Sequence, residues 1–437
     1  MDQPSDFEAG RGRNARTALV ILVIVNVMSQ LDRQVMNVLL PPVQTDLGLS
    51  DKQAGLLVGL AFAVCYSFAG LPLARFADRS SRTTLISVAL AVWSAMTAAC
   101  GIARNFLELF VARIGVGFGE AGCSPAAHSL LSDHFPPSHR GRALSTYQLG
   151  VPIGILIGSI LGGTLSDHLS WRAVFFTFGA PGLALAIWTR FVLEEPPRSH
   201  AGQADAVEPL AAVLAFFARC PAMRQNLIAA TLHTLAVGAQ VAFNFTFLTR
   251  VHHLSGTEAG IVTGLLTGIF GGIGTYLGGW LGDRFGARDP RWYLWWLAIG
   301  GLVSIPFSVL AYLVPSTPAS IVALSISVVG SYLYTGACHV IAQSLARPRM
   351  RALTAAIMLF SMNLLGYGLG APIAGVISDA FGGDQAIRYA LALMNVILAW
   401  ACLHYWLASR TYREDLRSET HVYAAQAEAT MPAQDLA

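Results

Sequence analysis

Residues 107–131 read LELFVARIGVGFGEAGCSPAAHSLL, and this stretch decides the fold class. It is long and apolar enough to cross a bilayer as an α-helix, yet it contains Arg113 and Glu120. Their spacing of seven residues places both on one helical face, about two turns apart. Since a charge near the bilayer centre costs about 2.5 to 3.5 kcal/mol, both should face a protein interior or a watery cavity. The stretch predicts a membrane helix that carries either functional charges or a structural ion pair.

The composition is that of a polytopic membrane protein. Of the 437 residues, 54% are hydrophobic and 12% are charged, which is too apolar for one soluble domain. The net charge of +3 suggests no nucleic-acid partner. The six cysteines are scattered without metal-ligand spacing, so we expect neither disulfides nor a metal site. The apolar run after residues 1–16 lacks a cleavage pattern, which predicts a retained first helix.

Apolar runs of spanning length occur twelve times, six in each half of the chain. They lie at 17–40, 53–73, 83–103, 107–131, 142–166, 172–193, 222–248, 257–281, 292–313, 317–344, 352–378 and 386–409. The pattern predicts an all-α membrane protein with twelve transmembrane helices in two pseudo-symmetric six-helix bundles, at 17–193 and 222–409. A tail at 1–16, a linker at 194–221 and a disordered tail at 410–437 should lie outside the membrane.

The basic residues predict the orientation. With a cytoplasmic N-terminus, 21 of the 28 Lys and Arg residues fall on the cytoplasmic side and 5 on the other, while Arg33 and Arg113 lie inside spans. This bias places both termini in the cytoplasm, and we expect the cell (inner) membrane.

Short segments recur at matching ends of matching spans. They are Asp78-Arg79 with Asp283-Arg284, Arg142-Ala143-Leu144 with Arg351-Ala352-Leu353, and Ser166-Asp167 with Ser378-Asp379, at offsets of 205, 209 and 212 residues. Each echo is short, but their similar spacing indicates an internal repeat with a site at its interface.

These features resemble the major facilitator superfamily, and the resemblance runs from residue 17 to residue 410. The loop signature Gly-x-x-x-Asp-Arg-x-Gly-x-Arg is complete as Gly279, Asp283, Arg284, Gly286 and Arg288. In the first half, Asp78, Arg79 and Arg82 remain, while Ala74 and Ser81 replace the glycines. The resemblance implies a transporter in which these charges bond to the neighbouring bundle and hold the cytoplasmic side shut in one state. The alternative is an ordinary positive-inside loop.

A narrower resemblance is to the spinster-like branch of that superfamily. It rests on Leu31-Asp32-Arg33, the run GEAGCSPAAHS at 119–129 and Phe135-Pro136-Pro137. Animal members of this branch carry lysolipids and sphingosine-1-phosphate, and bacterial members are thought to be proton-driven. The resemblance implies a proton-driven carrier. It specifies the family more narrowly than it specifies the substrate, because bacterial relatives have diverged in what they carry.

Helix geometry brings four charges to similar depths. Asp32 lies about 22 Å from the cytoplasmic face and Arg113 about 9 Å from the outer face, so in a core of about 30 Å they lie at nearly the same level. Glu120 lies about 10 Å deeper, close to the midplane. We expect Asp32 and Glu120 to take and release protons, while Arg33 and Arg113 stay charged and attract an anionic substrate.

The spans of the second half hold no acid, lysine or arginine away from their ends. Their polar groups are more often packing groups than proton carriers. Together with two residues of the fifth span, the candidates for a cavity wall are Tyr147, Gln148, His233, Gln240, Asn244, His339 and Asn363.

Enzymes are the competing class. The only lysine, Lys52, follows Asp51, so there is no Gly-x-x-x-x-Gly-Lys loop and direct ATP drive is unsupported. Neither His-Glu-x-x-His nor Gly-x-Ser-x-Gly occurs. Ser124 and His128 leave an intramembrane lipid hydrolase formally open, and a passive lipid scramblase is a third option.

The sequence therefore predicts a proton-coupled secondary active transporter that works by alternating access, with no enzymatic activity and no cofactor. We expect it to move an amphipathic organic anion or a lysolipid-like solute, with small aromatic or sugar acids as the alternative. Its expected partners are that solute, protons and membrane lipid, and we expect a monomer.

Overall fold

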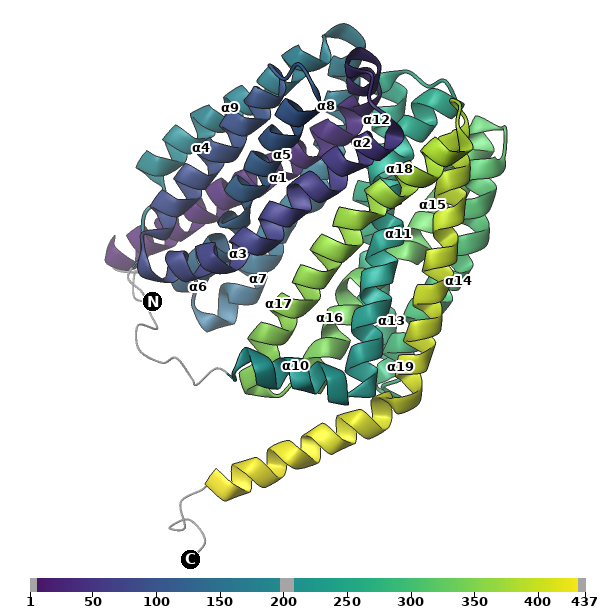
Figure 1. Ribbon diagram of the computed structural model, residues 1–437. Helices are drawn as coiled ribbons and strands as arrows, with labels where there is room; N and C mark the ends of the chain where they lie inside the picture. The colour runs from purple at the N-terminus through teal and green to yellow at the C-terminus, as the bar shows by residue number, and fades with distance from the viewer. Residues whose placement is uncertain (1–5, 197–207, 431–437) are drawn as a thin grey trace, which may run out of the picture. The chain divides into compact units, whose positions relative to one another are not determined.

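The computed structural model describes residues 6–196 and 208–430, and within these ranges every regular element is a helix (Figure 1). The first half contains α1 (Asp6–Leu47), α2 (Asp51–Gly55), the π-helix η1 (Leu56–Leu60), α3 (Ala61–Arg79), α4 (Arg82–Cys100), α5 (Phe106–Ala121), α6 (Cys123–His134), α7 (Pro137–Gln148), α8 (Gly150–His168) and α9 (Trp171–Val192). The second half contains α10 (Leu210–Arg219), α11 (Pro221–Val251), α12 (Gly256–Gly264), η2 (Leu265–Phe270), α13 (Gly271–Gly286), α14 (Trp292–Leu313), α15 (Thr317–Tyr332), α16 (Tyr334–Leu345), η3 (Pro348–Met350), α17 (Arg351–Ser361), η4 (Met362–Tyr367), α18 (Gly368–Phe381) and α19 (Ala386–Thr430).

Eleven helices within the described residues are long and apolar enough to cross a membrane, and each coincides with a predicted span. The predicted fourth span is instead divided into α5 and α6, which meet at Gly122. Pro125 explains the interruption, because it has no backbone N–H to donate to the carbonyl four residues earlier. The twelve-span topology in two six-helix bundles stays a prediction.

Contacts divide the chain into two compact units. Unit 1 comprises residues 1–201, 238–269 and 367–391, and unit 2 comprises residues 202–237, 270–366 and 392–437. Unit 1 thus contains α1 to α9 and, from the second half of the chain, all of α12 and α18 and parts of α11, η2 and α19. The two halves of the chain therefore meet inside unit 1.

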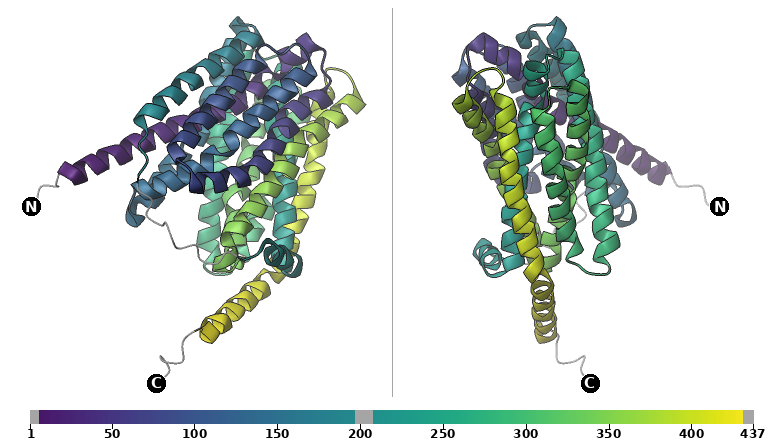
Figure 2. Two further views of the ribbon diagram at one scale, coloured as in Figure 1. Left: turned by 60° about the vertical axis from the view of Figure 1, so that its left-hand side comes forward. Right: turned by 90° about the vertical axis from the view of Figure 1, so that its right-hand side faces the viewer.

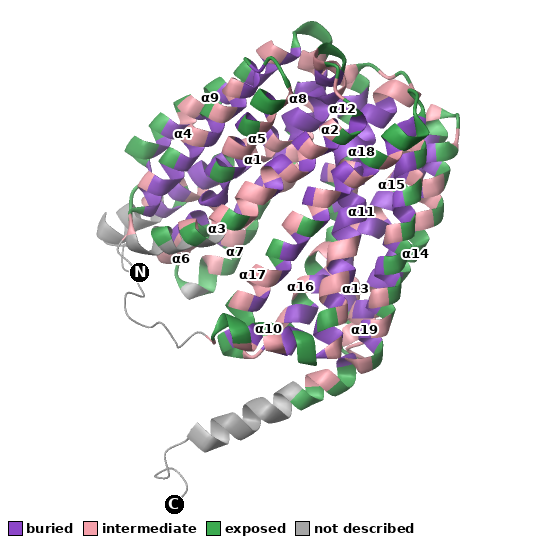
Figure 3. Cartoon of the chain, in the orientation of Figure 1, coloured by how far each residue is buried: buried purple, intermediate pink, exposed green. Residues whose placement is uncertain are grey.

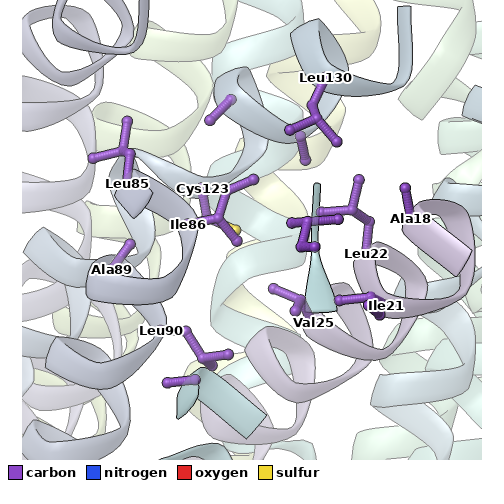
Figure 4. Close-up of a cluster of buried hydrophobic side chains, with 14 of the residues drawn as sticks. Ala18, Ile21, Leu22, Val25, Leu85, Ile86, Ala89, Leu90, Cys123 and Leu130 are labelled. Atoms are coloured by element: carbon purple, nitrogen blue, oxygen red, sulfur yellow. The ribbon is translucent and has the colours of Figure 1, made fainter. Parts of the chain in front are cut away.

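A buried apolar cluster packs together the helices that the first half of the chain contributes to unit 1. Figure 4 shows its side chains, which come mainly from α1, α4 and α6, with Ile21, Leu22, Ile86, Leu90 and Leu130 among them. All five are buried. The cluster fixes α1 against α4 and α6, the helices that flank the charged residues.

Glycines allow α1 and α8 to approach closely. A Cβ atom on Gly154 would lie 2.6 Å from Gln30 Cβ and 2.7 Å from the carbonyl oxygen of Val27. A Cβ atom on Gly150 would lie 3.0 Å from the side chain of Asn26. Small residues at this spacing let the two backbones pack without side chains between them.

Two helix contacts within unit 1 repeat one another. In the contact of α8 with α12, a Cβ atom on Gly260 would lie 2.3 Å from the carbonyl oxygen of Ser159. In the contact of α18 with α2, a Cβ atom on Gly55 would lie 2.4 Å from the carbonyl oxygen of Ala371. Ser159 and Ala371 are 212 residues apart, and Gly55 and Gly260 are 205 apart, the offsets of two of the sequence echoes.

Each of these contacts ends in an aspartate that caps the partner helix. Asp167 accepts hydrogen bonds from the backbone N–H groups of Gly256 and Thr257, both at 2.8 Å. Asp379 accepts from the backbone N–H groups of Asp51 and Lys52, at 2.9 and 3.0 Å. A carboxylate stabilises a helix N-terminus by accepting from unpaired donors and by opposing the helix dipole. We call Asp167 and Asp379, with the N–H groups that they cap, the aspartate latches.

Unit 2 packs α13, α14, α15 and α16 against one another. Ser304 on α14 forms hydrogen bonds with the hydroxyls of Ser327 and Ser331, at 2.8 and 2.6 Å. Exposed apolar side chains cover the outward faces of α14 and, in unit 1, of α9 (Figure 3). Such faces suit contact with lipid.

The last helix is longer than the sequence predicts. We expected disorder from residue 410, but α19 continues to Thr430 (Figure 2). Its final residues, AAQAEAT, consist mainly of strong helix formers, which explains the extension. The N-terminal part of α1 likewise extends past its neighbours in Figure 2.

Candidate functional site

Helices α1 and α5 bring the four predicted charges together inside unit 1. Asp32 is fully buried, and Arg113 and Glu120 are each 2% exposed. The side chain of Arg33 keeps 29% of its surface exposed. The prediction that Arg113 and Glu120 face a protein interior or a watery cavity is confirmed by their burial. We call these four residues the charge network.

Glu120 pairs with Arg33 across two helices. The Arg33 Nε atom donates to Glu120 Oε2 at 2.8 Å, and the Ser29 hydroxyl donates to the same oxygen at 2.8 Å. Among the described residues Glu120 forms its ion pair with Arg33 and not with Arg113, although helical spacing puts Arg113 and Glu120 on one face. The ion pair of the network is therefore between helices and not within α5.

Two aromatic rings of α3 lie against the arginines. The guanidinium carbon of Arg33 lies 4.5 Å from the ring centre of Phe62 and 4.8 Å from that of Tyr66. The guanidinium carbon of Arg113 lies 5.8 Å from the centre of Phe62. The faces of aromatic rings attract cations, so these rings fix both arginines without neutralising them. Sequence reasoning missed Phe62 and Tyr66, whose signal was their four-residue spacing on the predicted second span.

Several buried atoms of the network have no hydrogen-bond partner among the described residues. They are both carboxylate oxygens of Asp32, Glu120 Oε1, and Nε and Nη1 of Arg113. Trp93 and Thr97 of α4 lie beside Asp32, yet neither reaches hydrogen-bond geometry. Buried polar groups are normally satisfied, so this concentration indicates a site that binds something else.

Unit 1 also holds four of the predicted cavity residues. Tyr147 is buried, and its ring meets His128 edge-on at 5.3 Å. Gln240 and Asn244 are buried on α11. Gln148 is exposed.

The other three cavity candidates belong to unit 2. His233 is fully buried, stacks on Tyr334 at 4.0 Å and meets Tyr405 edge-on at 6.0 Å. Asn363 donates to the carbonyl of Leu359 in its own helix, at 2.9 Å. His339 is partly exposed. The surroundings of His233 and Asn363 fit packing and local hydrogen bonding.

Arg82 is bonded within the first half of the chain. It is 2% exposed, pairs with Asp133, and donates to Glu195 at 2.7 Å and to Ser129 at 3.1 Å. We expected the loop charges to bond to the neighbouring bundle, but Ser129 and Asp133 belong to α6 and Glu195 lies at the start of the predicted linker. Asp133 and Glu195 were missed because they lie 51 and 113 residues from Arg82.

Glu195 has a perturbed pKa for a visible reason. Burial by itself raises the pKa of this carboxyl, but the backbone N–H of Thr83 and the guanidinium of Arg82 outweigh burial, and the pKa lies below its ordinary value. The Thr83 N–H donates at 2.9 Å. Glu195 is therefore held in its charged form at neutral pH.

The remaining predicted gating charges are placed as follows. Asp283 accepts a hydrogen bond from the Tyr293 hydroxyl at 2.6 Å, and the guanidinium of Arg284 lies 5.7 Å from the centre of the Trp280 ring. Arg288 is exposed. The side chains of Asp78 and Arg79 lie outside the described residues.

The sequence of this chain is similar to those of known membrane transporters. The model of the Major Facilitator Superfamily matches residues 22–366 and 227–424. An MFS-type efflux pump of Mycolicibacterium smegmatis is 32% identical over 93% of this chain and 95% of its own length. A segment of the probable L-galactonate transporter of Escherichia coli, 38% of its length, is 30% identical to 39% of this chain.

Among solved structures, the chain is similar to a bacterial homolog of the human lysosomal transporter Spinster, in an inward-facing and unoccupied conformation. The TM-score is 0.85 at 29% identity, with 92% of this chain and 98% of that chain covered. The spinster-like resemblance, drawn from Asp32-Arg33 and from residues 119–129, is confirmed.

Proposed function

The chain belongs to the Major Facilitator Superfamily, and on that basis we propose that it is a proton-coupled secondary active transporter that works by alternating access. It lies in the inner membrane with twelve spans, and both termini are cytoplasmic. The observation that carries the proposal is the buried charge network, whose unpartnered atoms lie on α1 and α5. We also propose that the protein is a monomer.

The arginines bind the anionic group of the substrate. Arg113 has buried donors with no partner among the described residues, and Arg33 is the most exposed member of the network. A guanidinium binds a carboxylate or phosphate through paired hydrogen bonds. The rings of Phe62 and Tyr66 provide an apolar contact beside that group.

The acids couple transport to protons. Protonation of Glu120 removes the charge that holds Arg33, so Arg33 becomes available to an anion. Both carboxylate oxygens of Asp32 lack a hydrogen-bond partner among the described residues, and Asp32 belongs to the same network as Glu120. A change of about 1 kcal/mol in the balance of two states shifts their populations about fivefold.

The aspartate latches support alternating access. By the predicted orientation, Asp167 and Asp379 lie at the non-cytoplasmic ends of α8 and α18. Both join the first half of the chain to the second inside unit 1. The latches close that side, and their release accompanies opening to the outside.

The substrate is an amphipathic organic anion or a lysolipid-like solute. Two fixed cations beside apolar and aromatic walls suit a ligand with one charged end. A small sugar acid is the second candidate, and the similarity of one segment to a probable L-galactonate transporter favours it. A hydrolase built on Ser124 and His128, or a passive scramblase, would need neither of the buried acids.

The deciding experiment measures proton flux and solute uptake in reconstituted vesicles, with lysolipids and sugar acids offered separately. We expect one of the two classes of solute to be transported, and we expect its transport to be accompanied by proton flux. Arg33→Ala should abolish binding of that class, while Arg349→Ala, at an exposed arginine of unit 2, should not. Solute transport without proton flux would contradict the proposed proton coupling. Hydrolysis of the lipid would show that the protein is an enzyme.

A further inference from the structure

A cavity lies in unit 1, apart from the charge network. Its volume is about 570 Å³, and it is lined by residues of α1, α6 and α7 and of the turn between α6 and α7. These three helices contact one another. Arg16, at its wall, lies 17 residues before Arg33 on α1, which is about 25 Å along the helix axis. The cavity is therefore separate from the proposed transport site.

One wall of this cavity is basic. It is formed by Arg16, His134, His139 and Arg142, and none of its described lining residues is acidic. The buried Nε2 atom of His134 has no hydrogen-bond partner among the described residues. Such a wall attracts an anion.

The two nearest acids already have partners. Asp133 pairs with Arg82, and Glu194, which lies beside His134, accepts a hydrogen bond from the Asn14 side chain. Neither is in an ion pair with Arg16 or Arg142 in the structure. Both acids lie close enough to His134 to act on it electrostatically, but among the described residues neither neutralises Arg16 or Arg142 through an ion pair.

Apolar residues also line the cavity, and exposed apolar strips continue from it along the helices. Leu19, Phe135 and Ala143 line the cavity. On α1, Val20 and Ile24 follow Arg16 at four-residue intervals, on the same face, and they are 56% and 38% exposed.

A matching strip runs along α7 and α8. From Arg142 and Thr146 it continues through Leu149, Ile153 and Ile157, which are exposed and follow helical spacing. Helix α8 packs against α1, so the two strips belong to neighbouring helices. Ile24 lies about 12 Å beyond Arg16 along α1, a depth that acyl chains occupy.

We propose that this cavity binds the phosphate group of an anionic phospholipid, whose acyl chains lie along the two strips. Basic pockets between membrane helices on the cytoplasmic side suit anionic headgroups. A free phosphate ion would use the basic wall alone and leave the apolar lining residues and strips empty. The combination of both surfaces selects a lipid of the cytoplasmic leaflet, which is bound and not transported.

The test uses the full-length protein in detergent and measures binding by native mass spectrometry. Phosphatidylglycerol, phosphatidylcholine, glycerol 1-phosphate and inorganic phosphate are titrated separately. We expect phosphatidylglycerol to bind at least tenfold more tightly than the other three. In Arg16→Ala/Arg142→Ala the affinity for phosphatidylglycerol should fall about thirtyfold, because each arginine near an anionic lipid surface strengthens binding about fivefold. Arg349→Ala, which removes an exposed arginine outside the cavity, should leave it unchanged.

Two further variants separate binding from folding. Thr146→Trp fills the cavity but keeps both arginines, and it should also lose phosphatidylglycerol. Arg16→Lys/Arg142→Lys keeps the charge and should retain most of the affinity. Unchanged binding of phosphatidylglycerol in Thr146→Trp, or in the double alanine variant, overturns the proposal. Inorganic phosphate that displaces the lipid at similar concentration assigns the cavity to free phosphate and overturns it as well.

Discussion

In the proposed mechanism Glu120 is the residue on which proton coupling depends most directly, because its carboxylate binds both Arg33 and Ser29. Glu120→Gln mimics the protonated acid, so we expect it to bind and exchange substrate yet to lose acceleration by a pH gradient. Asp32→Asn should behave similarly, with a smaller effect. Counterflow and gradient-driven uptake in vesicles separate the two activities.

The matched control for this prediction is Glu108→Gln on the same helix, where the acid is exposed. It should keep full gradient-driven uptake. If Glu120→Gln and Asp32→Asn both retain gradient-driven accumulation, the two acids are structural and the coupling proposal is wrong.

Arg82 is a second residue whose loss has a calculable cost. Arg82→Ala removes the buried cation that pairs with Asp133 and Glu195, and breaking a buried pair in this way costs about 3 kcal/mol. We expect a lower thermal unfolding temperature in detergent. Arg284→Ala, whose exposed side chain contacts a tryptophan ring, should change it little.

The lowered pKa of Glu195 gives the same cluster a pH dependence. A carboxyl whose pKa is lower in the folded state stabilises the fold above its ordinary pKa, near 4.5, and that contribution is lost as the pH falls through the folded-state pKa. Thermal unfolding between pH 7 and pH 4 should therefore show a smaller loss of stability in Glu195→Gln than in the wild type. If the unfolding temperatures of the two proteins fall in parallel with pH, the contact of Glu195 with Arg82 does not contribute to stability in solution.

At the scale of the helices, the close contacts of α8 with α12 and of α2 with α18 depend on glycine. Gly260→Ala and Gly55→Ala would each place a methyl group within 2.4 Å of a carbonyl oxygen, so each should destabilise its contact by about 1 to 3 kcal/mol. Gly272→Ala is the control, because nothing lies within 4 Å of its added Cβ. Equal unfolding temperatures for all three variants would show that the helices shift at little cost.

The aspartate latches make a prediction at the same scale. Removing one N-cap carboxylate costs about 1 kcal/mol, so Asp167→Ala/Asp379→Ala should shift the balance of states about thirtyfold toward release. Spin labels at the exposed positions Thr45 and Asp384 would report the distance across the latch of Asp379. A distance distribution identical to that of the wild type would leave the latches without a gating role.

At the scale of the whole molecule, the sequence was sufficient for the parts of the fold that depend on local pattern. Hydropathy located the helices, and the cost of a charge in lipid predicted that Asp32, Arg113 and Glu120 are buried. The sequence could not identify the partner of Glu120, because helical spacing defines a face of α5 but not the helix that packs against that face. The same limit hid Phe62 and the partners of Arg82, which only the packing of distant segments brings close.

The repeat is the other part that the sequence showed only in outline. The Ser-Asp pairs at 166–167 and 378–379 indicated a duplication, but nothing local indicated that each aspartate would cap a helix from the other half of the chain. That pairing depends on α8 meeting α12 and α18 meeting α2. Long-range contacts of this kind depend on the assembled fold.

The duplicated latch also bears on leakage. A carrier that opened to both sides at once would let protons run freely down their gradient and waste the energy that it is meant to use. When two well-separated contacts break independently, the chance that both are broken at one moment is the product of the two separate chances. If the latches close one side of the carrier as proposed, two modest bonds can therefore seal that side far more tightly than either could, while each stays weak enough to break quickly. A single damaged latch would then appear as a proton leak before it appeared as lost transport.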